Sequence, residues 1–147
     1  KWYHIGDGLE RNTLEKLSKE LKIDYEFIGA ISNQEVLKFY GEKEIYFFIH
    51  MSSTEGGTPV SMMEAQSFGI PIIATNVGGV SEIVNEKTGR LLSVNPKIEE
   101  IVEAIEKIIN LDDCKYQEYR ENSYLNWQKN FNAENNYSNF IENIKGL

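Results

Sequence analysis

Cysteine is almost absent from this chain of 147 residues, which holds only Cys114. A single cysteine cannot form an internal disulfide, so the composition favours a reducing compartment, the cytoplasm. No cluster of cysteine and histidine has metal-ligand spacing. We therefore expect no protein-bound metal ion in this domain. No other cofactor is expected either.

Basic residues are also scarce: 15 lysines and arginines stand against 23 acidic residues, a net charge of −8. Nucleic-acid binding needs a basic face, so we do not expect this protein to bind nucleic acid. No apolar run reaches transmembrane length and no signal peptide is recognisable. The chain starts at Lys1 in strand-like sequence, from which we expect a fragment of a longer protein.

The residues that are present centre on one stretch, Ser52 to Ala65. The apolar run Ile45–Ile49 before it predicts a strand buried on both faces. Val60 to Phe68 predicts a helix ended by Gly69, and Ile70–Ala74 predicts a second strand. A strand, a glycine loop, a helix and a strand form the βαβ unit of a parallel sheet. Ligands of such sheets bind at the carboxyl ends of the strands, where this loop is expected.

The loop itself has residues that suit a phosphorylated sugar ligand. Gly56 and Gly57 would let the backbone approach a ligand and adopt positive φ. The following helix N-terminus favours phosphate oxygens, and Pro59 suits its first turn. Glu55 and Glu64 can accept hydrogen bonds from sugar hydroxyls. Taken alone, two such glutamates would more often be a turn residue and a solvated helix residue.

A longer pattern surrounds these glutamates. Ser52-Ser53-Thr54-Glu55-Gly56-Gly57-Thr58-Pro59-Val60-Ser61-Met62-Met63-Glu64-Ala65 is followed by Gly69-Ile70-Pro71-Ile72-Ile73-Ala74-Thr75 and by Asn76-Val77-Gly78-Gly79-Val80-Ser81-Glu82-Ile83-Val84. This pattern resembles the glutamate-pair motif of retaining glycosyltransferases with the two-domain GT-B fold, the family 4 or "group 1" class. The resemblance runs from Ile5-Gly6-Asp7-Gly8 to the C-terminus.

The resemblance implies a role for each site residue. Glu55 would be the catalytic-site carboxylate that contacts the transferred sugar, and Glu64 would hold the ribose hydroxyls. The backbone of Gly56, Gly57 and Thr58 would approach the sugar and diphosphate, with Val60 near the phosphates at the helix start. One departure concerns Glu55: eight residues separate it from Glu64, where the family has seven. The extra residue must be absorbed by the loop.

The remaining elements complete an alternating pattern. Strands are predicted at 2–5, 25–28 and 90–94, the last being an edge strand that follows a left-handed Gly89. Helices are predicted within 9–22, after Ser32 and Glu35 as a capping box, at 81–84, from Asn95-Pro96 onward, at 112–130 and at 133–144. The fold class is therefore α/β with a doubly wound, Rossmann-like parallel sheet, forming one domain over 1–147. By resemblance it is the C-terminal half of a GT-B fold, truncated at its N-terminal edge.

The sequence leaves two features open. His50 follows the first strand of the central unit and could be catalytic, although a hydrogen-bonded structural imidazole is the commoner case. Gly78-Gly79 could be a plain turn or could line the same crevice as the glycine loop.

By resemblance, the full protein would transfer a sugar from a nucleotide-sugar donor to a lipid-linked or cell-surface polysaccharide precursor. A missing N-terminal domain would bind the acceptor and could mediate peripheral association with the inner face of the membrane. The family's diphosphate-neutralising arginine and lysine lie upstream of this chain, so we expect the isolated chain to be inactive. The alternatives are a non-catalytic or regulatory nucleotide-sugar-binding GT-B module and a sugar-nucleotide epimerase, whose family lacks the long motif.

Overall fold

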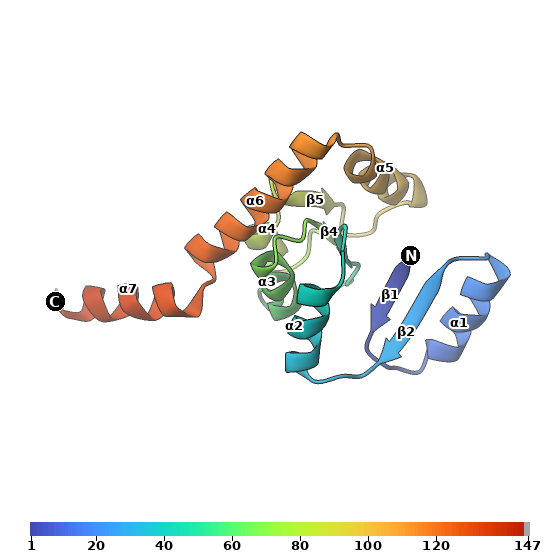
Figure 1. The fold of residues 1–147 in the computed structure, drawn as a ribbon, viewed down its shortest axis with the longest axis horizontal. Helices are drawn as coiled ribbons and strands as arrows, with labels where there is room; N and C mark the ends of the chain where they lie inside the picture. The colour runs from blue at the N-terminus through green and yellow to red at the C-terminus, as the bar shows by residue number, and fades with distance from the viewer. Residues whose placement is uncertain (146–147) are drawn as a thin grey trace. The chain divides into compact units, whose positions relative to one another are not determined.

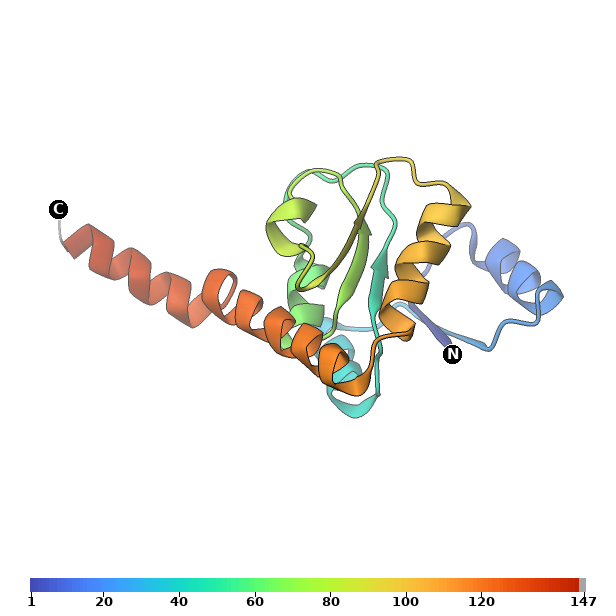
Figure 2. The same ribbon diagram turned by 90° about the horizontal axis from the view of Figure 1, so that it is seen from above.

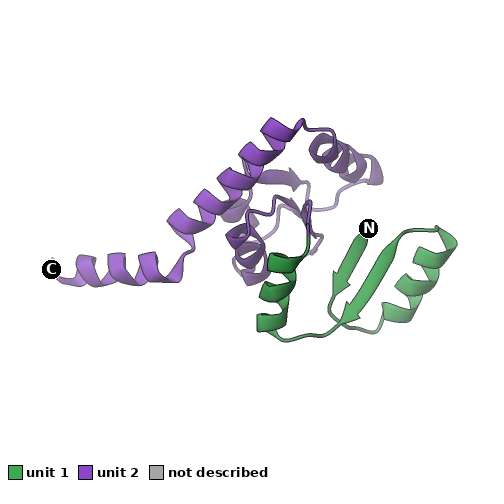
Figure 3. Cartoon of the chain, in the orientation of Figure 1, with its two compact units in different colours: residues 1–43 green, residues 44–147 purple. Residues whose placement is uncertain are grey.

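The computed structural model describes residues 1–145, and the chain forms two compact units (Figure 3). Unit 1 is Lys1–Lys43, and unit 2 begins at Glu44. The predicted single domain over 1–147 includes Gly146 and Leu147, which lie outside the described residues, and it stays a prediction.

Unit 1 is a βαβα segment built around two parallel strands. Its elements are β1 (Trp2–Ile5), α1 (Arg11–Glu20), β2 (Tyr25–Gly29) and α2 (Asn33–Glu42). Strands β1 and β2 pair from Trp2 opposite Tyr25, and the register shifts between His4 and Ile5. The predicted capping box at the start of α2 is confirmed, because the Ser32 hydroxyl accepts from the Glu35 amide while the Glu35 carboxylate accepts from the Ser32 amide.

Unit 2 holds a second parallel sheet with strand order β3-β4-β5, of which β4 and β5 are labelled in Figure 1. Its elements in chain order are β3 (Phe48–His50), α3 (Val60–Ser67), β4 (Ile72–Thr75), α4 (Val80–Ile83), β5 (Gly89–Leu92), α5 (Ile98–Ile109), α6 (Asp113–Asn130) and α7 (Ala133–Lys145). The predicted α/β class with parallel strands is confirmed. No helix within residues 1–145 combines the length and the apolar character needed to cross a membrane.

The core of unit 2 lies on both faces of β4, all four residues of which are buried. Ile72 and Ala74 face a cluster with residues of α3 and α4, whereas Ile73 faces Ile108 of α5. The alternation follows from the two-residue period of a strand. Figure 2 shows α3 and α4 on one side of this sheet and α5 on the other. Helices therefore cover both faces, which is the arrangement of a doubly wound sheet.

Strand β3 differs from the prediction for Ile45–Ile49. It begins at Phe48, includes His50, and leaves the Ile49 side chain 43% exposed. Among the described strands of unit 2 it pairs only with β4, so it is an edge strand and lacks cover on one side. An apolar run alone does not distinguish an edge strand from a central one, and the expected burial on both faces was wrong here.

Gly89 also departs from its prediction. It does not have positive φ but is the first residue of β5, directly opposite Ile72 of β4. A Cβ atom at this position would lie 1.8 Å from the carbonyl oxygen of Ile72. The glycine is therefore required by the close approach of two strands and not by a left-handed turn.

Candidate functional site

The predicted site lies where β3, β4 and β5 end at the same edge of their parallel sheet. His50 and Thr75 are the last residues of β3 and β4. The loop 51–59 leaves this edge and leads into α3, and the Thr75 hydroxyl donates to the carbonyl oxygen of Ser52 at 2.5 Å. The end of β4 thus anchors the start of the loop that carries the predicted site residues.

Glu55 is held by the end of β3. Its Oε1 lies 2.7 Å from Nε2 of His50, and the two side chains are only 24% and 17% exposed. Hydrogen bonds from the Ser52 side chain and then from His50 lower the pKa of Glu55 below its ordinary value. An ionised carboxylate only accepts hydrogen bonds, so the imidazole carries its proton on Nε2. Despite the extra residue in the loop, the Glu55 side chain has a defined place.

Gly56 and Gly57 have open space in front of them. Neither has positive φ, so the expectation that these two glycines adopt a left-handed conformation was wrong. A Cβ atom on either would meet nothing within 4 Å, and both residues are exposed. The advantage of glycine here is room for an approaching molecule. Thr58 follows, half-buried, with its hydroxyl 3.4 Å from the Glu82 carboxylate of α4.

The positive φ of this region occurs instead at Gly78, with φ of 53°. The Gly78-Gly79 turn packs against the glycine loop: the Gly79 amide donates to the carbonyl oxygen of Gly57 at 3.1 Å. A Cβ atom at Gly78 would lie 2.6 Å from the carbonyl oxygen of Glu55. Gly78-Gly79 is thus a turn, and it lies directly against the glycine loop of the predicted site.

Gly78→Ala is expected to displace the site loop and to destabilise unit 2 by about 1–3 kcal/mol, because both the positive φ and the backbone contact disfavour a side chain. Amide chemical shifts of residues 52–58 and the urea midpoint would measure the two effects. Gly56→Ala is the matched control. Apart from the shifts of residue 56 and its sequence neighbours, which any substitution there alters, it should change neither quantity by much, since its Cβ would meet open space. Equal behaviour of the two variants would contradict the packing argument.

Helix α3 brings Val60 and Glu64 to one face. Val60 is its first residue and 64% exposed, and the N-cap residue, Pro59, makes no side-chain capping hydrogen bond. Glu64 is half-buried and lies four residues later, so it is one turn further on the same side. The helix N-terminus favours an anion, whereas the carboxylate favours hydroxyl groups. This combination suits a ligand that has both phosphate and sugar.

Metal-ligating side chains do not gather in this domain: within residues 1–145, no three histidine, cysteine, aspartate or glutamate side chains come together as a metal site. The expectation of a metal-free domain stays a prediction.

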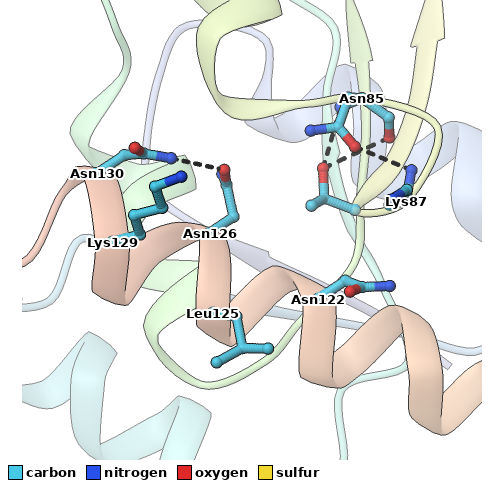
Figure 4. Close-up of a pocket in the computed structure, with 8 residues that line it drawn as sticks. Asn85, Lys87, Asn122, Leu125, Asn126, Lys129 and Asn130 are labelled. Atoms are coloured by element: carbon cyan, nitrogen blue, oxygen red, sulfur yellow. Dashed lines mark hydrogen bonds between the residues drawn. The ribbon is translucent and has the colours of Figure 1, made fainter.

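A groove of about 350 Å³ lies elsewhere, between α6 and the turn that precedes β5 (Figure 4). The Asn126 amide donates to Gln66 and to the carbonyl oxygen of Ile83, and the Asn130 amide donates to Asn126. The Thr88 hydroxyl donates to the same Ile83 carbonyl oxygen. These polar groups connect α3, α4 and α6 to one another. Because β5 begins here, the groove lies at the amino edge of the strands, opposite the predicted site.

Two contacts of the site are not predicted by the sequence: the His50–Glu55 hydrogen bond and the packing of Gly78 on Glu55. The signals that point toward them are the position of His50 at a strand end, five residues before Glu55, and the paired glycines after the next strand. Neither signal identifies its partner without the sheet order.

Comparison with known proteins finds a family whose model matches most of this chain. The family model "Glycosyl transferases group 1" matches residues 4–126. A Haemophilus influenzae protein described as an uncharacterized glycosyltransferase is 34% identical over 107 residues, covering 72% of this chain and 30% of its own length. The Escherichia coli O-antigen biosynthesis glycosyltransferase WbnH is 34% identical over 120 residues. This match covers 80% of this chain and 31% of WbnH. The chain thus spans about a third of the length of these relatives.

Solved structures share the fold at lower identity. The Anabaena protein Alr3699/HepE, determined in complex with UDP and glucose, has a TM-score of 0.75 and 20% identity, covering 99% of this chain and 40% of its own. WaaG, a glycosyltransferase involved in lipopolysaccharide biosynthesis, has a TM-score of 0.73 and 17% identity. The match covers 88% of this chain and 34% of WaaG.

Proposed function

Because the chain belongs to the group 1 glycosyltransferases, we propose that it is the donor-binding part of a retaining enzyme that transfers a sugar from a nucleotide-sugar donor to an acceptor. One observation carries the proposal. Two glutamates, an open glycine loop and a helix N-terminus whose N-cap residue is Pro59 lie together in the segment 55–64, which leaves the carboxyl edge of a parallel sheet. Parallel α/β sheets bind their ligands at that edge.

Each residue is proposed to take one part of the donor. Glu64 accepts hydrogen bonds from the ribose hydroxyls, and Glu55 accepts from a hydroxyl of the transferred sugar. The backbone of Gly56, Gly57 and Thr58 faces the sugar and the diphosphate, where added Cβ atoms on the two glycines would meet nothing. Val60, at the start of α3, brings the N-terminal amides of the helix to the phosphates. The low pKa of Glu55 keeps it an acceptor.

The relatives support the donor and acceptor classes. The Anabaena structure contains UDP and glucose, the parts of a nucleotide sugar. The name of the E. coli relative refers to O-antigen biosynthesis. We therefore propose a lipid-linked or cell-surface polysaccharide precursor as acceptor, bound by an N-terminal domain that also contacts the inner face of the membrane. We also propose a cytoplasmic location and no metal in this domain.

The test is a calorimetric panel of UDP, GDP, ADP and their sugars on the full-length protein. The proposal expects one base to be preferred and its nucleotide sugar to bind at the same site as its diphosphate, so that the two compete. Binding without any sugar transfer or donor hydrolysis would favour the second candidate, a non-catalytic nucleotide-sugar module. The residue inserted between Glu55 and Glu64 is the observation that favours that candidate. Binding of none of these nucleotides would contradict both.

A further inference from the structure

We propose that His50 is a positioning residue, which holds the Glu55 carboxylate in the orientation needed to accept a hydrogen bond from the transferred sugar. The inference rests on the proposed function, because it assigns a purpose to His50 only if Glu55 meets the sugar. It concerns a residue outside the glutamate-pair motif.

The two partners lie on different kinds of backbone, a paired strand and an irregular loop. His50 is the last residue of β3 and pairs with the buried Ala74 of β4. Its ring is nearly parallel to that of Phe48, with 16° between the planes and 6.3 Å between the centroids. Glu55, by contrast, lies in the irregular loop 51–59, which carries an inserted residue. A side chain on a paired strand therefore reaches a carboxylate on a loop.

The geometry of the contact suits this purpose. The distance of 2.7 Å from Nε2 to Oε1 is short for a hydrogen bond between nitrogen and oxygen, as expected when the acceptor is charged. The imidazole donates this bond through its Nε2–H group, and the carboxylate accepts it. The Ser52 side chain also hydrogen-bonds this carboxylate, and the backbone turn at Gly78 packs against Glu55. The imidazole is therefore one of three contacts that restrict the side chain.

A purely structural histidine would make the same contact, so the test must separate the two roles. Gln and Asn supply the matched pair: the glutamine amide reaches roughly the position of Nε2, whereas the asparagine amide ends near that of Nδ1. If His50 only fills space or adds stability, both variants behave alike. If it orients Glu55, His50→Gln recovers most of what His50→Asn loses.

The experiment measures donor hydrolysis and diphosphate binding by the full-length protein, with the nucleotide sugar and the diphosphate that the panel selects. We expect His50→Asn to lower kcat for donor hydrolysis by roughly 10- to 100-fold, the effect of a misplaced group. Binding of the free diphosphate should stay within about 2-fold, because Glu55 contacts the sugar and not the diphosphate. His50→Gln should be at least several-fold faster than His50→Asn.

A double-mutant cycle shows whether His50 acts through Glu55. In a Glu55→Ala background, His50→Asn should cause no further loss of rate, because the group that it positions is already gone. Additive losses, equal rates for the Asn and Gln variants, or a parallel loss of diphosphate binding would each overturn the positioning role. In all three cases the unmodified protein still binds nucleotide, so the proposed function would remain intact. An unmodified protein that binds no nucleotide would overturn both.

Discussion

Gly89→Ala is expected to destabilise unit 2 by roughly 3 kcal/mol or more, at the upper end of what single substitutions cause. The added Cβ would lie 1.8 Å from the Ile72 carbonyl oxygen, 2.7 Å from its carbonyl carbon and 2.8 Å from its nitrogen. All three are backbone atoms of the central strand, so no side chain can rotate to relieve the contact. The two strands would have to separate, and both core clusters of unit 2 include residues of β4.

Urea unfolding followed by tryptophan fluorescence would measure this effect. Trp127 lies in α6 of unit 2 and Trp2 lies in unit 1, so a Trp2→Phe background reports on unit 2 alone. Gly8→Ala is the control, because its Cβ would meet nothing within 4 Å. A midpoint for Gly89→Ala close to that of this control would show that β4 and β5 are not packed as described.

Glu64→Ala should weaken binding of the preferred diphosphate to the full-length protein by roughly 1.5–3 kcal/mol, about 10- to 150-fold in Kd. The reason is the loss of a charged acceptor for the ribose hydroxyls. Glu64 lies on α3, one turn beyond the exposed Val60 at the helix start, where the phosphates are proposed to bind. Calorimetry alongside the nucleotide panel gives the measurement.

The matched control is Glu86→Ala, which removes the same charge from the exposed turn before β5, at the opposite edge of the sheet. It should leave Kd unchanged, so a general effect of net charge is accounted for. Equal binding by Glu64→Ala and the unmodified protein would make Glu64 a structural helix residue. The non-catalytic module would then become the better description of this chain.

Local signals in the sequence predict helices and strands well where the residues that determine the element lie within one short segment. Ser32 and Glu35 form their capping box because both partners lie within one helical turn. Helix α3 follows Pro59 and is followed by Gly69 with φ of 66°, as the residue types indicate. The run Ile70–Ala74 predicts a strand, and β4 covers Ile72–Thr75 with both faces buried. The motif from Ser52 onward indicates the family through its residues alone, and the matching family model confirms it.

The sequence by itself thus determined the alternation of strands and helices, the family, and the glutamates of the candidate site, since each depends on residues close together in the chain. Only the tertiary structure decided which groups from different strands and loops come into contact. Parallel strands bring Gly89 against Ile72, Gly78 against Glu55, and His50 to the edge where Glu55 lies. These contacts depend on the order and register of strands, which long-range packing sets and which no local pattern of residues encodes.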